Sequence, residues 1–141
     1  MTYTVNSTTL TNLVTEEVSR VAAASYSEDG TSQYDSVVIH SRDADSVSRM
    51  IRDCVDAVAK RIADICTVVA SPLALTISVP DFDTTKETMV KDELDRAISL
   101  GAVATWLKEK LPSRSDEFAA RANAAMDVAV GMLKTRTAPT R

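Results

Sequence analysis

Glycine, proline and histidine are scarce in this chain of 141 residues, which contains 3 Gly, 4 Pro and a single His, His40. So few glycines and prolines exclude a glycine-rich phosphate loop, a collagen-like repeat and a β-sandwich with many tight turns. A lone histidine excludes most zinc enzymes, Ser-His and Cys-His nucleophilic sites, and the paired Glu-x-x-His helices of di-iron bundles. His40 lies beside a polar turn and is interpreted as a surface residue; a pH-sensitive or ligand-binding side chain is the alternative.

Cysteine and aromatic residues are also rare. The two cysteines are Cys54 and Cys66, and aromatic residues make up 4% of the chain. Both cysteines are predicted to lie on one helix, about 18 Å apart along its axis, which is too far for an intrachain disulfide. We therefore expect inert buried thiols, typical of a reducing compartment. An acidic helical body with few aromatic residues disfavours direct, sequence-specific binding of nucleic acid.

Long apolar runs are missing as well. No stretch of the sequence approaches the ~20 apolar residues that cross a bilayer, and residues 1–7 have neither a basic region nor an apolar core. We therefore expect no membrane span and no secretion signal. The composition is otherwise globular, with 45% hydrophobic and 26% charged residues. Length and composition together predict a single helical domain over residues 1–141, with residues 134–141 as a flexible C-terminal segment.

Hydrophobic periodicity predicts an all-α, four-helix bundle-like domain with one or two short β-strands and a mobile basic C-terminal segment. The helices are expected near residues 9–25, 46–70, 86–110 and 115–134. In the first helix, Leu10, Leu13 and Val14 belong to the face that is expected to be buried. Candidate N-cap residues of the first, third and fourth helices are Thr8 or Thr9, Thr84 or Thr85, and Ser115.

The third predicted helix is apolar nearly all round over residues 97–107, a pattern typical of a central, buried helix. Trp106 is interpreted as an anchor of the core, and a binding hot spot is the alternative. Gly101 lowers the helix propensity of this segment, which indicates that another backbone comes close at that position.

One segment alternates with a period of two. Leu75, Ile77 and Val79 alternate with small or polar residues, which predicts a β-strand over residues 73–79. A single strand cannot satisfy its own backbone hydrogen bonds. It must pair with residues 37–40, with residues 3–5, or with another subunit. In the last case Leu75, Ile77 and Val79 form an inter-subunit strand.

Charge is distributed unevenly along the chain. Residues 1–107 hold 9 basic and 16 acidic residues, whereas residues 108–141 hold 7 basic and 4 acidic ones. The last eight residues contain three cations and no acid. We predict that this segment docks on an acidic partner surface; a solvated segment whose cations only favour a helix C-terminus is the alternative. The residues assigned to docking are Lys134, Arg136, Pro139 and Arg141.

Motifs that carry chemistry are missing. The sequence has no Cys-x-x-Cys pair, His-Glu-x-x-His motif or Gly-x-Ser-x-Gly motif. Asp53, Asp56 and Asp64 are interspersed with cations on one helix face, which indicates a solvated surface rather than a metal or acid–base site. We therefore expect no catalytic residue, no metal and no cofactor, and a protein that is not an enzyme.

The last third of the chain has a distinctive order of elements. Residues 91–108 form a helical pattern that ends in Trp106-Leu107-Lys108, and Pro112 follows in a short turn. An Ala-rich helix then leads into the basic residues 136–141. Together with the long loop and long helix before it, this arrangement resembles the head–tail connector proteins of tailed bacteriophages, also called adaptors or head-completion proteins.

The resemblance implies a structural virion protein. Such connectors form a ring, commonly of twelve subunits, beneath the portal at the capsid vertex, where they extend the DNA channel and offer a platform to the next tail component. It implies a portal protein and a tail or stopper protein as partners, and a location in the virion and, during assembly, in the host cytoplasm. Because the helices look sufficient for a stable monomer, the state in solution stays open. An unrelated cytoplasmic helical-bundle module for protein–protein interaction or regulation is the alternative.

Overall fold

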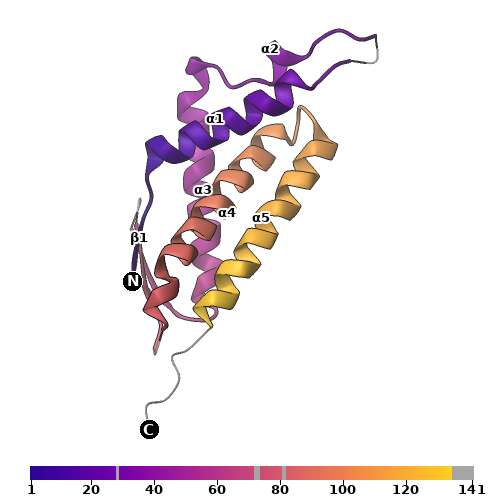
Figure 1. Cartoon of the computed structure of the whole chain (residues 1–141). Helices are drawn as coiled ribbons and strands as arrows, with labels where there is room; N and C mark the ends of the chain where they lie inside the picture. Colours follow the sequence, from indigo (N-terminus) through magenta and orange to yellow (C-terminus); the bar gives the residue numbers. More distant parts are fainter. Residues whose placement is uncertain (28, 72–73, 81, 135–141) are drawn as a thin grey trace.

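The computed structural model of the chain describes residues 1–27, 29–71, 74–80 and 82–134. Four long helices and a small sheet dominate these residues (Figure 1), which confirms the predicted all-α, bundle-like domain with a few short strands. The long helices are α1 (Ser7–Ala23), α3 (Ala44–Ala63), α4 (Glu87–Leu107) and α5 (Pro112–Leu133). The shorter elements are α2 (Tyr34–Val37), the 3₁₀ turns Ser41–Asp43 and Thr84–Lys86, and strands β1 (Thr2–Thr4), β2 (Thr67–Ser71) and β3 (Ala74–Ser78).

Helix α4 is the centre of the fold. It packs against α5, α3 and α1, and nine of the eleven residues from Ala97 to Leu107 are buried. An apolar surface on all sides of a helix can leave water only if neighbours cover every side, and three long helices do so here. The predicted central, buried helix is confirmed.

Helix α5 runs antiparallel to α4 after a short turn. It begins at Pro112, where the fixed φ of proline suits the first helical turn. The prediction of Ser115 as N-cap is wrong, because Ser115 lies one turn inside the helix. There its buried hydroxyl donates a hydrogen bond of 2.7 Å to the carbonyl of Ala104. Ser115 therefore joins α5 to α4 instead of capping α5.

The N-termini of α1 and of the 3₁₀ turn that leads into α4 are capped upstream of the predicted residues. The side chain of Asn6 accepts a hydrogen bond of 3.0 Å from the backbone N–H of Thr9. The carboxylate of Asp83 accepts one of 3.1 Å from the backbone N–H of Thr85, at the 3₁₀ turn before α4. Thr9 and Thr85 therefore donate their backbone N–H groups to the caps. The capping side chains are those of Asn6 and Asp83, residue types that are strongly preferred at the N-cap position.

The second predicted helix is too long by seven residues. Helix α3 ends at Ala63, and Thr67–Ser71 forms strand β2 instead. The β-branched run from Thr67 to Val69 favours a strand, and pairing of Val68 with Ile77 of β3 satisfies its backbone within the sheet. Cys66 therefore lies outside the helix that carries Cys54, and the prediction of one helix for both cysteines is wrong.

The sheet contains three antiparallel strands in the order β1-β3-β2. Residue Tyr3 of β1 pairs with Leu75 of β3, which confirms the predicted pairing with residues 3–5. The alternative partner, residues 37–40, is wrong because Tyr34–Val37 is a short helix. The inner face of the sheet carries the buried side chains of Tyr3, Leu75 and Ile77, and its outer face carries Thr2, Thr4, Thr76 and Ser78.

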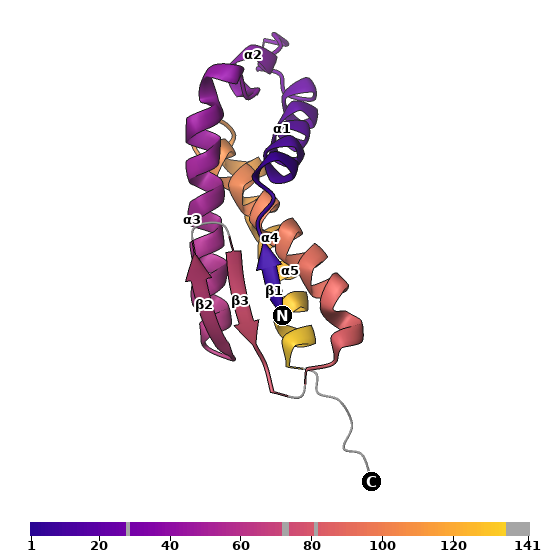
Figure 2. The same ribbon diagram turned by 90° about the vertical axis from the view of Figure 1, so that its left-hand side faces the viewer.

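The two ends of the α4–α5 hairpin differ. The sheet lies beside the last turns of α3, at the end where α5 finishes (Figure 2). The segment with α2 lies at the opposite end, beside the turn that joins α4 to α5. We call these two ends the sheet end and the loop end.

Candidate interaction surfaces

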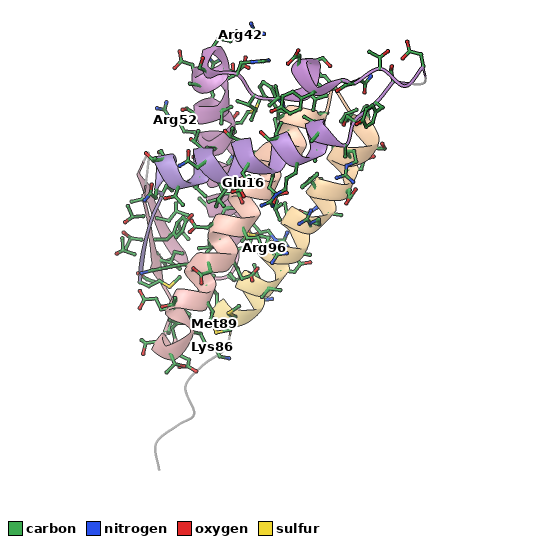
Figure 3. The ribbon with its side chains drawn as sticks, turned by 45° about the horizontal axis from the view of Figure 1, so that its top comes forward. Glu16, Arg42, Arg52, Lys86, Met89 and Arg96 are labelled. Atoms are coloured by element: carbon green, nitrogen blue, oxygen red, sulfur yellow. The ribbon has the colours of Figure 1, made fainter. Side chains whose placement is uncertain are left out.

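A shallow groove runs along the side of the molecule where α1 crosses α4 and α4 meets α5. It consists of two adjoining hollows of about 370 Å³ and about 240 Å³ that share Arg96 of α4 and Arg121 of α5. Figure 3 shows Arg96 on α4 just below the point where α1 crosses it. We call this surface the lateral groove. Its other lining residues are Leu13, Glu17, Asp92, Asp95, Ser99 and Leu100 in the larger hollow and Glu93, Ala124, Ala125 and Val128 in the smaller one.

Large apolar side chains lie exposed along this side. Leu13 of α1 is 39% exposed, Val128 of α5 48% and Met89 of α4 56%. Met89 precedes Arg96 by seven residues, so the two share one face of α4. Single exposed hydrophobic residues are common, but three beside one groove are typical of a surface that contacts another protein.

The groove carries charges of both signs. Asp92 and Arg96 of α4 are exposed and lie one turn apart, and neither forms an ion pair within the described residues. The guanidinium of Arg121 lies 5.0 Å from the centre of the Phe118 ring, where a cation–π contact holds it against α5. The groove thus presents cations with no carboxylate partner next to carboxylates with no cation.

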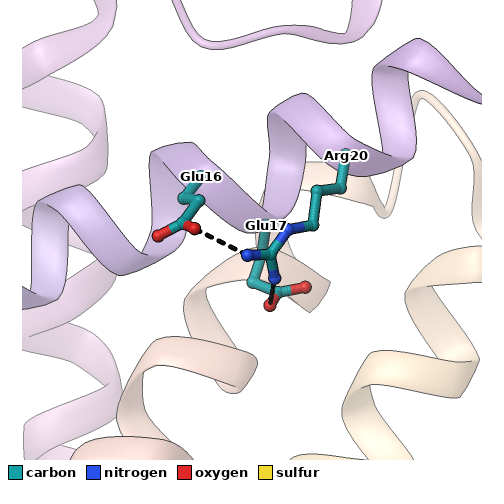
Figure 4. Close-up of polar contacts among 3 residues, drawn as sticks. All are labelled: Glu16, Glu17 and Arg20. Carbon is teal, nitrogen blue, oxygen red and sulfur yellow. Dashed lines mark hydrogen bonds and ion pairs between the residues drawn. The ribbon is translucent and has the colours of Figure 1, made fainter.

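The α1 rim of the groove is locally neutralised. Arg20 donates to the carboxylates of Glu16, at 2.6 Å, and of Glu17, at 2.8 Å (Figure 4). Arg20 and Glu16 are exposed and Glu17 is half-buried, so the two pairs contribute little to the free energy of unfolding. Their effect is to occupy the charge of Glu17, which leaves Asp92, Glu93 and Asp95 as the groove carboxylates without a cation among the described residues.

A buried tyrosine ties the sheet to the edge of the groove. The hydroxyl of Tyr3 donates a hydrogen bond to the carboxylate of Asp95 on α4. Burial raises the pKa of Tyr3 well above its ordinary value, and the hydrogen bond and negative charge of Asp95 raise it further. Tyr3 is therefore a neutral donor across the whole physiological range, and Asp95 is already committed to the fold.

A second hollow, of about 170 Å³, lies on the opposite side of α4, between α3 and α5. Cys54 and Gly101 line it, and a Cβ atom at Gly101 would lie 3.2 Å from the Cys54 sulfur. The close approach that Gly101 indicated therefore comes from a side chain rather than from a backbone. Burial, followed by the charge of Asp53, raises the pKa of Cys54 to about 11, so its thiol stays protonated and unreactive.

Trp106 holds the loop end together. Its indole N–H donates a hydrogen bond of 2.7 Å to the carbonyl of Val37, and the ammonium of Lys110 lies 4.9 Å from its ring and donates to the carbonyl of Ser36. Trp106 is 9% exposed, which confirms its prediction as a core anchor. In contrast, Tyr26 and Tyr34 of the same end are 62% and 41% exposed.

His40 has a structural role in the turn before α3. Its backbone N–H donates to the carboxylate of Asp43 at 2.9 Å, and its Nε2 lies 3.0 Å from the carbonyl of Asp35. The side chain is half-buried rather than fully exposed. Among the residues that the structure describes, no group of three or more His, Cys, Asp or Glu side chains is placed to hold a metal ion.

The predicted strand residues lie in the core. Leu75 and Ile77 are fully buried on β3, and Val79, just after the strand, is half-buried. Strand β3 is central, with β2 on one side and β1 on the other. Its backbone therefore has partners in the same chain on both sides, which leaves β3 no free edge for an inter-subunit strand.

The predicted docking residues fall mostly beyond the described part of the chain. Lys134 is exposed at the end of α5, at the sheet end of the molecule. Arg136, Pro139 and Arg141 lie outside the described residues.

The lateral groove was not predicted from the sequence. Leu13 was assigned to the buried stripe of the first helix, and its exposure depends on how far α1 extends over α4. Val128 carried a weak signal, because it lies off the stripe formed by Phe118, Ala125 and Ala129. No local pattern distinguishes Asp92 and Arg96 from an ordinary solvated pair.

No protein-family model matches the sequence, and no curated protein or solved structure matches it at a significant level. Within the described residues, no helix combines the length and the apolar character that crossing a membrane requires.

Proposed function

We propose that the protein is a structural assembly protein of a tailed bacteriophage, a subunit of the head–tail connector ring beneath the portal. In this role it extends the DNA channel and gives the next tail component a surface to dock on. Its partners are further copies of itself, the portal protein and a tail or stopper protein. It acts in the virion after assembly in the host cytoplasm.

The observation that carries this proposal is the difference between the two ends of the α4–α5 hairpin. Helix α5 leads through the exposed Lys134 into a segment whose sequence adds Arg136 and Arg141 and no acid. The loop end, about 33 Å away along the 22 residues of α5, presents Tyr26 and Tyr34. A protein that joins two components needs two separate docking ends, and cations at one end suit an acidic partner surface.

The basic segment gives the proposal its test. The protein with residues 135–141 deleted should fold normally, because the described core does not include those residues. It should fail to bind the portal protein encoded nearest to its gene when the two are co-expressed and purified together. The measurement is the mass of the co-purified complex, compared with that of the full chain.

A matched control tests whether the position of the removed cations matters or only their number. The variant Lys134→Gln, Arg136→Gln, Arg141→Gln removes three cations from the segment. The control Arg49→Gln, Arg52→Gln, Lys60→Gln removes three exposed cations from α3. We expect only the first variant to lose portal binding. Equal binding by both variants and by the deletion would contradict the connector role and favour a helical interaction module unrelated to phage assembly.

A further inference from the structure

The exposed side of α4 carries two opposite charges without partners. Asp92 and Arg96 have the spacing and order that favour an ion pair within a helix, yet they do not pair. Glu87 and Lys91, on the same helix with the same spacing, do pair, at 3.1 Å. Asp92 and Arg96 are therefore available to a partner.

The apolar side chains of the lateral groove lie on both sides of this charge pair. Leu13, on the α1 side of α4, lines the larger hollow, and Val128, on the α5 side, lines the smaller one. Arg96 belongs to both hollows and lies between them. The surface thus has an acid and a base along α4 and one exposed apolar residue on each side of it.

We propose that a second copy of this chain occupies the lateral groove, with the two α4 helices antiparallel about a twofold axis that passes between Asp92 and Arg96. Such an axis reverses α4, so Arg96 of each copy faces Asp92 of the other. The axis lies in the interface and is perpendicular to α4, so each flank of the groove meets the same flank of the partner: Leu13 of each copy faces Leu13 of the other, and Val128 faces Val128. Each copy supplies both halves of every contact, as an isologous interface requires.

Self-complementarity is the reason to name a second copy as the occupant. The groove holds carboxylates and guanidinium groups side by side, so a partner of a single charge sign would meet like charges. A second copy in the antiparallel orientation meets Asp92 with Arg96 and Arg96 with Asp92. The dimer covers both grooves, so no groove remains for a third copy. This contact is independent of the proposed docking of residues 134–141.

The first experiment measures the mass of the full chain by sedimentation velocity from about 10 µM to about 500 µM, the range that detects dimers of micromolar affinity. We expect a reversible change from the monomer mass of 15.2 kDa to twice that value. A protein that stays monomeric over the whole range, or that forms a series of larger species, overturns the proposal.

The second experiment exchanges the charges. Arg96→Glu and Asp92→Arg should each weaken the dimer by at least about tenfold, because each places like charges face to face. An equimolar mixture of the two variants should dimerise again, since both contacts of the mixed dimer then join a carboxylate of the first variant to a guanidinium of the second. The control Arg52→Glu, on the exposed side of α3, should leave the dimer unchanged. Single variants that dimerise normally, or a mixture that stays monomeric, overturn the proposal.

The third experiment tests the orientation. In a background with Cys54→Ala and Cys66→Ala, Leu13→Cys chains alone and Val128→Cys chains alone should each form a disulfide-linked homodimer under mild oxidation. A mixture of the two variants should form no Leu13–Val128 heterodimer, because the twofold axis places each of these residues opposite its own copy; parallel α4 helices would give the heterodimer instead. A Leu13–Val128 heterodimer in the mixture, or no linking of either variant with itself, contradicts the antiparallel arrangement. Circular dichroism of each variant confirms that the chain is folded.

Discussion

The two halves of α4 differ in burial although one continuous helix contains both. Nine of the eleven residues from Ala97 to Leu107 are buried, whereas only Val90 and Leu94 are buried from Glu87 to Arg96. The C-terminal half contacts Cys54 of α3, Ser115 of α5 and the loop end through Trp106. The N-terminal half contacts the sheet through Tyr3 and borders the lateral groove.

This difference separates the residues that stabilise the protein from those that can bind a partner. Burial of apolar surface in the C-terminal half supplies folding free energy. In the N-terminal half, Met89, Asp92 and Arg96 remain exposed and make few contacts. Substitutions in the two halves should therefore have different consequences, and four of them test the comparison.

The largest effect should come from Trp106, in the buried half. Trp106→Ala removes a large core side chain and its hydrogen bond to Val37, and it should lower the free energy of unfolding by ~3–5 kcal/mol. Urea denaturation followed by circular dichroism measures it. Trp106→Phe is the matched control, since it keeps most of the ring and loses the donor, and it should cost ~1–3 kcal/mol. A loss below ~1 kcal/mol for Trp106→Ala would show that the loop end does not depend on this side chain.

Tyr3 comes next, where the sheet meets the exposed half of α4. Tyr3→Phe should cost ~1.5–3 kcal/mol, because it removes a hydrogen bond to a carboxylate. Burial and Asp95 raise the pKa of Tyr3 above the 10.0 of an unperturbed tyrosine. The folded protein therefore keeps the phenol proton that the unfolded chain loses above about pH 10.

The sign of the pH dependence follows from this raised pKa. The contribution of Tyr3 to the free energy of unfolding is fully present below pH ~10 and falls as the pH rises above that value. Between pH 9 and pH 11 (about the range that spans the ordinary tyrosine pKa), the wild-type protein should lose stability more steeply than Tyr3→Phe. Parallel curves for the two proteins would contradict the buried hydrogen bond.

Substitution of Gly101 should change the free energy of unfolding by a smaller amount. The change should depend on whether the Cys54 sulfur is present. Gly101→Ala gains about 1 kcal/mol of helix propensity, but the new Cβ lies 3.2 Å from the Cys54 sulfur. We expect a change near zero in the wild-type protein and a stabilisation of up to about 1 kcal/mol when Cys54→Ala removes the sulfur. Thermal denaturation of the four proteins of this cycle measures the coupling. The same change in both backgrounds would exclude contact between the two positions.

Arg96 should give the smallest effect on folding, because it lies in the exposed half. Arg96→Ala should change the free energy of unfolding by no more than about 0.5 kcal/mol, since the side chain is exposed and forms no ion pair among the described residues. Measurement at low protein concentration keeps association from contributing. A loss of more than ~1 kcal/mol would place Arg96 among the residues that hold the fold together.

Much of the fold could be predicted because its determinants are local. The i and i+4 hydrogen bonds of a helix form between residues close in sequence, so periodicity alone located α1, α4 and α5 to within a few residues. The apolar surface of residues 97–107 was enough to identify the buried helix and the place of Trp106. The end of α3 was missed, because Ile65 and Cys66 continue its helical spacing while Thr67 already starts a strand.

The sequence by itself determined the helical class, the central helix and the uneven distribution of charge, all of which depend on residue type and spacing. Only the tertiary structure decided that β3 pairs with β1, that Leu13 stays exposed, and that Asp92 and Arg96 lie unpaired beside a groove. Periodicity shows which residues share a face of a helix, but not whether another element covers that face. Coverage depends on the crossing of α1 over α4 and on contacts between residues distant in sequence, which no local pattern encodes.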